Sequence, residues 1–161
     1  MFKAIKELNK PSRLLTLIQK FPNDHIDVDS EGRLYINDLP FKDHMRSYYA
    51  NSYEIEEKMD NLTLTVSGFQ GSYSSFTDER RDWYDYTYDV SCKFSLKNGM
   101  NEIAYGDFTR NVRTEADRNE YDSDNSLTIY DPEDNECDDE YGVEEILEDL
   151  VHNMASDFKD L

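Results

Sequence analysis

The amino-acid sequence predicts an α+β fold, in which an antiparallel β-sheet carries N-terminal helices and a C-terminal amphipathic helix. The main observation is the stretch Tyr84–Leu96, where every second residue is apolar or aromatic over thirteen residues. So strict a period of two has almost no helical alternative and indicates a long strand with one apolar face. Apolar residues recur at helical spacing before residue 22 and after residue 142. The order helices, strands, helix is typical of α+β domains.

The chain of 161 residues is long enough to bury a core without disulfides or metals, and we expect a single domain. Its expected parts are a helical N-terminal segment (1–22), a sheet region (23–130), an acidic loop (131–142) and a C-terminal helix (143–160). In the first part, Phe2–Asn9 and Ser12–Phe21 have the apolar spacing of two amphipathic helices. Pro11 separates these helices and Pro22 ends the second.

The residues after Pro22 predict a short hairpin. Ile26–Val28 and Leu34–Ile36 alternate apolar and polar residues on either side of Gly32, whose φ is expected to be positive. The dipeptide Leu39-Pro40 is expected to end this hairpin. Phe41–Asp60 fits neither a helical nor a strand period, so we expect a connector with one or two helical turns.

Three more segments complete the predicted order of elements. Leu62–Val66 alternates with threonines and is a second clear strand, whereas Thr114–Ser126 is polar and charged and is expected to be a loop. Leu127–Tyr130 is a short strand. The final helix places its apolar residues on one face, namely Val143, Ile146, Leu147, Leu150, Val151, Met154 and Phe158.

The long strand is expected to turn back through a hairpin. Asn98-Gly99 between two alternating runs is the sequence signal of a type I′ turn. This turn would set Phe94 opposite Ile103. Phe108 would then face outward, so a bulge at Gly106 is expected to return it to the apolar face.

The net charge of −19 is the most unusual number in the composition, with 36 acidic and 17 basic residues. Residues 115–161 alone carry eighteen acids and two bases, against a basic N-terminal segment. A surface this negative repels nucleic acid and anionic membranes and attracts a basic protein surface. Solubility is an equally good explanation of such a charge. Charge does not decide between a monomer and a homodimer.

The two cysteines point to a reducing compartment. Cys92 lies on the apolar face of the long strand and is expected to be a buried thiol, whereas Cys137 lies in the acidic run. Their spacing suggests no disulfide. With no signal peptide and no apolar stretch long enough to span a membrane, the sequence predicts a cytoplasmic protein.

The sequence holds no motif for catalysis or for a cofactor, and we expect neither an enzyme nor a metal site. His25, His44 and His152 lack partners at metal-like spacing, so solvated or structural histidines are favoured. Acidic runs beginning at Asp122 and Asp131 lack the glycine that a calcium-binding EF-hand loop needs at its sixth position, so solvated loops are favoured over weak calcium binding.

A family resemblance adds what the patterns do not. The opening residues Met-Phe-Lys-Ala-Ile-Lys-Glu-Leu-Asn-Lys-Pro-Ser and the length of the chain resemble the T-even phage inhibitors of the host Lon protease, the PinA-type family. The resemblance implies a host-takeover protein that acts in the host cytoplasm. It would bind a hexameric AAA+ protease and block ATP-dependent protein degradation, without chemistry of its own.

The expected partner-binding surface is the most acidic run of the chain. A basic partner would be drawn to it, because surface charges of this kind increase association rates. Its candidate residues are Asp131, Glu133, Asp134, Glu136, Asp138, Asp139, Glu140 and Tyr141.

Two other functions compete with inhibition of a protease. A nucleic-acid mimic would inhibit a restriction or CRISPR enzyme, provided that its carboxylates follow an elongated face as phosphates do. A secretion-type chaperone is also small, acidic and α+β, and the predicted second helix followed by the hairpin at residues 26–36 is similar to the start of that class.

Overall fold

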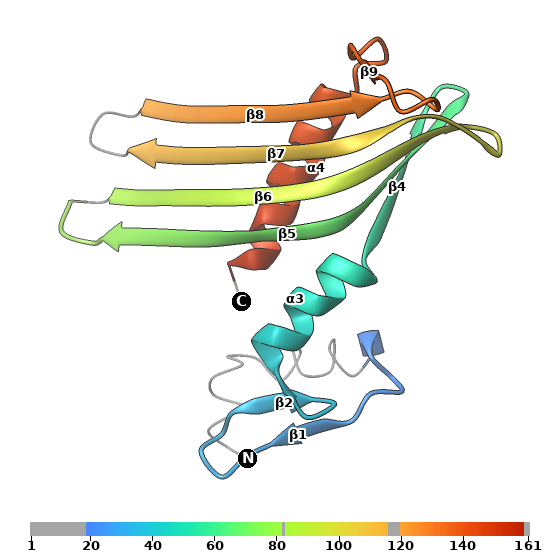
Figure 1. Cartoon of the computed structure of the whole chain (residues 1–161). Helices are drawn as coiled ribbons and strands as arrows, with labels where there is room; N and C mark the ends of the chain where they lie inside the picture. The colour runs from blue at the N-terminus through green and yellow to red at the C-terminus, as the bar shows by residue number, and fades with distance from the viewer. Residues whose placement is uncertain (1–18, 82, 116–119, 160–161) are drawn as a thin grey trace. The chain divides into compact units, whose positions relative to one another are not determined.

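The computed structural model describes residues 19–81, 83–115 and 120–159 (Figure 1). The chain comprises two compact units, Met1–Tyr48 and Tyr49–Leu161. The two predicted N-terminal helices lie outside the described residues, except that residues 19–20 are helical. The described part is mostly strand, arranged in antiparallel sheets, and it ends in the predicted C-terminal helix.

The first unit contains the predicted hairpin. Strands β1 (Ile26–Val28) and β2 (Leu34–Ile36) pair antiparallel, and Gly32 in their connection has a φ of 85°, as expected. Leu39–Pro40 does not simply end the hairpin but forms a third strand, β3, paired with β2. Asn37 and Asp38 both take positive φ and so close a tight two-residue turn between β2 and β3.

The predicted connector at Phe41–Asp60 is instead a helix and a strand. Helix α3 (Phe41–Asn51) has three turns and buries Met45 and Tyr49, which are four residues apart. Strand β4 (Glu54–Met59) follows. Its alternation is weak because it lies at the edge of the second sheet, where Ile55 is only half-buried.

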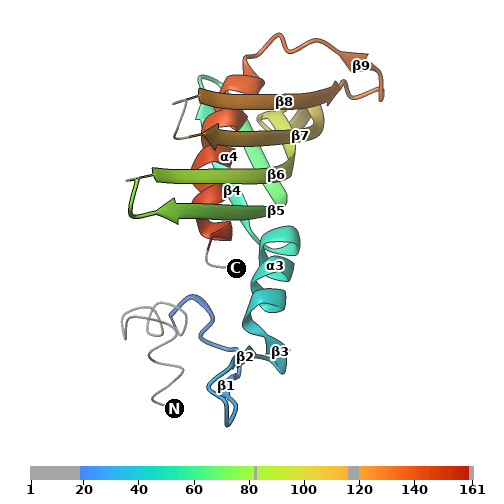
Figure 2. The ribbon, with the colours of Figure 1, turned by 90° about the vertical axis from the view of Figure 1, so that its left-hand side faces the viewer.

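The second unit is built on a six-stranded antiparallel sheet whose strands follow one another in chain order (Figures 1 and 2). After β4 come β5 (Leu62–Asp78), β6 (Trp83–Asn98), β7 (Asn101–Glu115), β8 (Glu120–Tyr130) and β9 (Glu136–Cys137). The prediction of a loop at Thr114–Ser126 was wrong, because β7 and β8 extend into this segment. Its residues show no apolar alternation because both faces of β8 are polar there, where Asp122, Ser123 and Asp124 are all exposed.

The predicted register of the β6–β7 hairpin was also wrong. Its loop residues are Gly99, with a φ of 63°, and Met100, which is the pattern of a type II′ turn rather than type I′. Phe94 lies opposite Gly106, and the extra residue is Ile103. Gly106 is therefore no bulge. A Cβ atom there would lie 1.8 Å from the Thr128 carbonyl oxygen, so the residue permits close strand approach.

Helix α4 (Val143–Phe158) packs across one face of this sheet, as predicted. In Figure 1 it crosses behind β5, β6 and β7. Among the described residues, no helix has both the length and the apolar character needed to cross a membrane. The helix buries Val143, Leu147, Val151, Met154, Ala155 and Phe158 against core residues of the sheet that include Leu64, Val66, Phe69, Val90, Cys92, Phe94, Leu96 and Phe108.

Candidate protein-binding surface

The acidic loop, residues 131–141, connects β8 to α4 at one edge of the large sheet (Figure 2). Asp131 and Asp139 are half-buried, while the other six candidate residues are exposed, namely Glu133, Asp134, Glu136, Asp138, Glu140 and Tyr141. The Tyr141 side chain is 43% exposed. The structure therefore brings all eight predicted residues into one surface segment.

Asp131 holds the first part of the acidic loop in shape. Its carboxylate accepts hydrogen bonds from the backbone N–H groups of Glu133 and Asn135, both at 2.9 Å. The N–H of Asp131 donates to the Asn135 carbonyl at 2.9 Å, and its own carbonyl accepts from the Asp134 N–H at 3.0 Å. Such a turn, in which an aspartate side chain satisfies nearby backbone donors, restrains the backbone locally.

A tyrosine of the sheet contacts the tip of this turn. The Tyr105 hydroxyl donates a hydrogen bond to the Asp134 carboxylate, and its ring stacks on that of Tyr130 with centroids 5.4 Å apart. The hydrogen bond to a carboxylate raises the pKa of Tyr105 to about 12. β9 adds a second attachment, since Cys137 pairs with Ile129 at the end of β8.

Asp139 links the end of the acidic loop to helix α4. Its two carboxylate oxygens accept the N–H groups of Val143 and Glu144, each at 2.9 Å. These are donors of the first helical turn, which have no partner inside the helix. Asp131, Asp134 and Asp139 thus hold the loop, and the acids that remain available for a partner are Glu133, Glu136, Asp138 and Glu140.

Sequence reasoning missed a polar cluster beneath α4. Arg110 lies on the covered face of β7 and is 4% exposed. Its guanidinium donates to Asn125 at 2.7 Å and to the Tyr88 hydroxyl at 3.2 Å, and lies 3.3 Å from Glu148 of α4. The sequence held one signal for this cluster: Arg110 alternates with Phe108 and Val112 and so takes a position on the apolar face of its strand.

The three histidines lie in different parts of the chain. His152 of α4 contacts Tyr88, with 2.9 Å between Nδ1 and the hydroxyl oxygen. His44 of α3 packs edge-on against Phe21 at 5.1 Å, and the backbone N–H of His25 donates to Asn37. The described ranges contain no group of three or more metal-ligating side chains.

The face of the sheet opposite α4 carries a shallow depression of about 160 Å³. Its lining mixes both signs of charge, with Asp89, Asp122 and Asp124 around Arg113. Arg113 and Asp122 are directly opposed across β7 and β8. Because the Arg113 guanidinium offsets part of the charge of these acids, this face has a weaker net field than the acidic loop.

Comparison with known proteins yields no match to a family model, to a curated protein sequence or to a solved structure.

Proposed function

We propose that this chain is a binding protein that inhibits a host AAA+ protease of the Lon type, with the acidic loop as its partner-binding surface. The observation that carries the proposal is the conformation of the loop. Its exposed acids lie on a backbone held by Asp131 at one end and by Asp139 at the other. The resemblance of the opening residues to phage inhibitors of Lon supports the choice of partner.

A restrained loop favours binding for two reasons. The conformational entropy that a flexible segment loses on binding is already lost in the folded protein, so less of the interaction free energy is offset. The exposed carboxylates also produce a concentrated negative field, which speeds encounter with a basic surface. Tyr141, beside these acids, supplies an exposed aromatic ring of the kind found at interface centres.

The test is degradation of an unfolded protein by purified Lon and ATP in the presence of this chain. The test variant combines Glu133→Gln, Glu136→Gln, Asp138→Asn and Glu140→Gln, which spares the three aspartates that hold the loop. The control variant combines Glu54→Gln, Glu56→Gln, Glu57→Gln and Asp60→Asn. All four control acids are exposed, on β4 and the turn after it, so the change in net charge is the same.

We expect the wild-type chain and the control to inhibit degradation, and the test variant to bind several-fold more slowly at low salt. Its binding should also depend less on ionic strength. A test variant that binds Lon as fast as the control at low salt would reject the acidic loop as the binding surface. A restriction enzyme is assayed in parallel to test the competing hypothesis that the chain is a nucleic-acid mimic. Inhibition of that enzyme and not of Lon would reject the protease as partner.

A further inference from the structure

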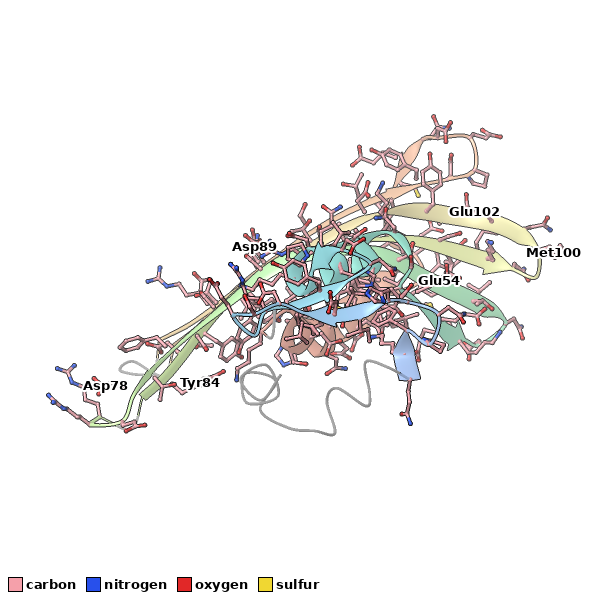
Figure 3. All side chains as sticks on the ribbon, turned by 90° about the horizontal axis from the view of Figure 1, so that it is seen from below. Glu54, Asp78, Tyr84, Asp89, Met100 and Glu102 are labelled. Atoms are coloured by element: carbon pink, nitrogen blue, oxygen red, sulfur yellow. The ribbon has the colours of Figure 1, made fainter. Side chains whose placement is uncertain are left out.

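One long stretch of the sheet edge has no neighbouring strand among the described residues. Strand β4 pairs with β5 only over Leu62–Ser67, and the register of β5 then shifts between Ser67 and Gln70. From Gln70 to Asp78, β5 pairs with β6 alone. Figure 3 labels Glu54, where β4 begins, and Asp78, far along β5 at the end of the sheet. We call residues 70–78 the β5 edge.

The hydrogen bonds of β6 reveal which groups of the β5 edge point outward. The backbone N–H of Tyr86 donates to the Thr114 hydroxyl of β7 at 2.9 Å, so Tyr86 directs its backbone groups toward β7. Along an antiparallel strand, the N–H and carbonyl groups of successive residues point alternately to one side and to the other. Two residues directly opposite each other either both point toward the partner strand or both point away from it. Ser75, the partner of Tyr86, therefore directs its N–H and carbonyl away from β6, as do Gly71 and Tyr73.

The β5 edge carries a single charged residue, Asp78 at its end, whereas the other edges carry several. Residues 70–77 include no charged side chain and no proline. By contrast, the outer strand β4 carries Glu54, Glu56 and Glu57, and the outer edge of β8 carries Asp122 and Asp124. Charged residues on edge strands prevent pairing with other chains, and a long uncharged edge permits it.

We propose that the β5 edge binds the β5 edge of a second copy of this chain, antiparallel and about a two-fold axis at Tyr73. Each Tyr73 then exchanges two backbone hydrogen bonds with Tyr73 of the second copy. Gly71 does the same with Ser75 of the second copy, because both residues direct their groups outward. An isologous contact of this kind is self-complementary and closes as a dimer. It joins the two sheets into one.

The aromatic side chains of this region continue across the proposed interface. The Tyr73 ring stacks on Tyr86 with centroids 6.0 Å apart and planes 5° apart, and it lies similarly against Tyr88. Its hydroxyl contacts that of Tyr84 at 2.8 Å. A second Tyr73 opposite the first would add an aromatic cross-strand pair, which stabilises antiparallel pairing.

The layout of charge favours this edge over the other one. The acidic loop follows β8 and β9, four strands away from β5. At a strand spacing of about 4.8 Å this separation is about 19 Å, more than twice the screening length of about 8 Å at physiological salt. At low salt the screening length is longer, about 30 Å at 0.01 M, so two chains of net charge −19 repel each other there. Raising the salt from that condition should strengthen the dimer, whereas it should weaken binding of a basic partner to the acidic loop.

Analytical ultracentrifugation of the full chain at low and at high salt tests the proposal with a matched pair of proline variants. Ser75→Pro removes an outward N–H from the β5 edge and leaves the hydrogen bonds to β6 in place. Ser123→Pro is its control. Ser123 lies opposite Val112, the partner of Tyr88, so its N–H also points outward, but from the β8 edge. Both serines are exposed.

We expect the wild-type chain and Ser123→Pro to dimerise, more tightly at high salt, and Ser75→Pro to dissociate about tenfold more readily or to be monomeric. Circular dichroism should show an unchanged fold in both variants. A monomeric wild-type chain at every salt concentration would overturn the proposal and leave the edge to an extended segment of another protein. A folded Ser75→Pro variant that dimerises like wild type would overturn it too.

A second pair of variants covers the case in which proline disturbs folding. Ser74→Lys adds a charge to the exposed face of the β5 edge, and Ser126→Lys adds the same charge to the same face of β8. Only Ser74→Lys should weaken the dimer. Equal effects of the two lysines would contradict the assigned interface.

Discussion

Two halves of the large sheet carry the same alternation of side chains and yet differ in their surroundings. In the covered half, under α4, Val66, Phe94 and Leu96 are at most 4% exposed. In the uncovered half, toward the β5–β6 turn, Tyr84 lies on the same face and is 45% exposed. Strict alternation therefore identified the strand and its faces along the whole of β6, but it identified the core along only part of it.

The difference follows from how α4 crosses the sheet. The helix runs across β5, β6 and β7 and not along β6 (Figure 1). A helix with its side chains is about 10–12 Å wide, whereas the sixteen residues of β6, at about 3.3 Å per residue, span about 53 Å. The helix therefore covers only part of the strand, and the apolar face beyond it includes Tyr84. A tyrosine tolerates this position because it has an apolar body and a polar tip.

Removal of α4 should have the largest effect on this contrast. A chain that ends at Gly142 loses the cover of Val66, Phe94 and Leu96, so both halves of the sheet become exposed. We expect an insoluble chain, or one that lacks a cooperative unfolding transition in calorimetry. A truncated chain that still unfolds cooperatively would show that the helix is dispensable for the core.

Phe94→Ala should have the next largest effect, because it removes a large side chain from the covered half. We expect a loss of about 3–5 kcal/mol in the free energy of unfolding, measured by chemical denaturation. A loss below about 1 kcal/mol, the range of surface substitutions, would mean that this position is not part of a packed core.

Glu148→Ala tests the polar cluster between the two halves. The substitution leaves the buried Arg110 guanidinium without its carboxylate, and we expect a loss of about 1–3 kcal/mol, since Glu148 itself is partly exposed. Glu145→Ala, at an exposed position on the same helix, is the control and should change stability by less than about 0.5 kcal/mol. Similar losses in the two variants would contradict the role of Arg110.

The thiol of Cys92 makes stability depend on alkaline pH. Burial, with a smaller effect of Asp107, raises its pKa to about 12 from an ordinary value near 9. The unfolded chain loses this proton at lower pH than the folded chain, so the contribution to stability is complete below pH 9. It falls by about 1.4 kcal/mol per pH unit as the pH rises toward 12. Cys92→Ala should remove this part of the pH dependence, and an identical profile for both chains would refute it.

Tyr84→Ser should have the smallest effect, because it lies in the uncovered half. Its hydroxyl contact with Tyr73 is exposed to water, as is the contact between its ring and Lys159. We expect a change of about 0.5 kcal/mol or less in denaturant unfolding. A change as large as that of Phe94→Ala would show that the uncovered half is buried in solution, for example against another chain.

The sequence by itself determined the features that depend on neighbouring residues. The strand at Tyr84–Leu96, the hairpin around Gly32 and the apolar face of α4 all follow from local periodicity or turn chemistry, and the structure confirms them. The exposure of the acidic run also followed from its composition. These properties need no knowledge of what lies across the molecule.

Tertiary structure alone decided what depends on residues far apart in the chain. Arg110 is satisfied by Asn125 of the next strand and Glu148 of the last helix, so no local pattern could reveal its partners. Contacts with Tyr105 and with α4 determine that Asp134 and Asp139 hold the acidic loop and so are not available to a partner. Among the described residues, the β5 edge has no neighbouring strand because the much shorter strand β4 pairs only with the first part of β5. Coverage and pairing are long-range contacts, and periodicity along one strand carries no information about how far its neighbours extend.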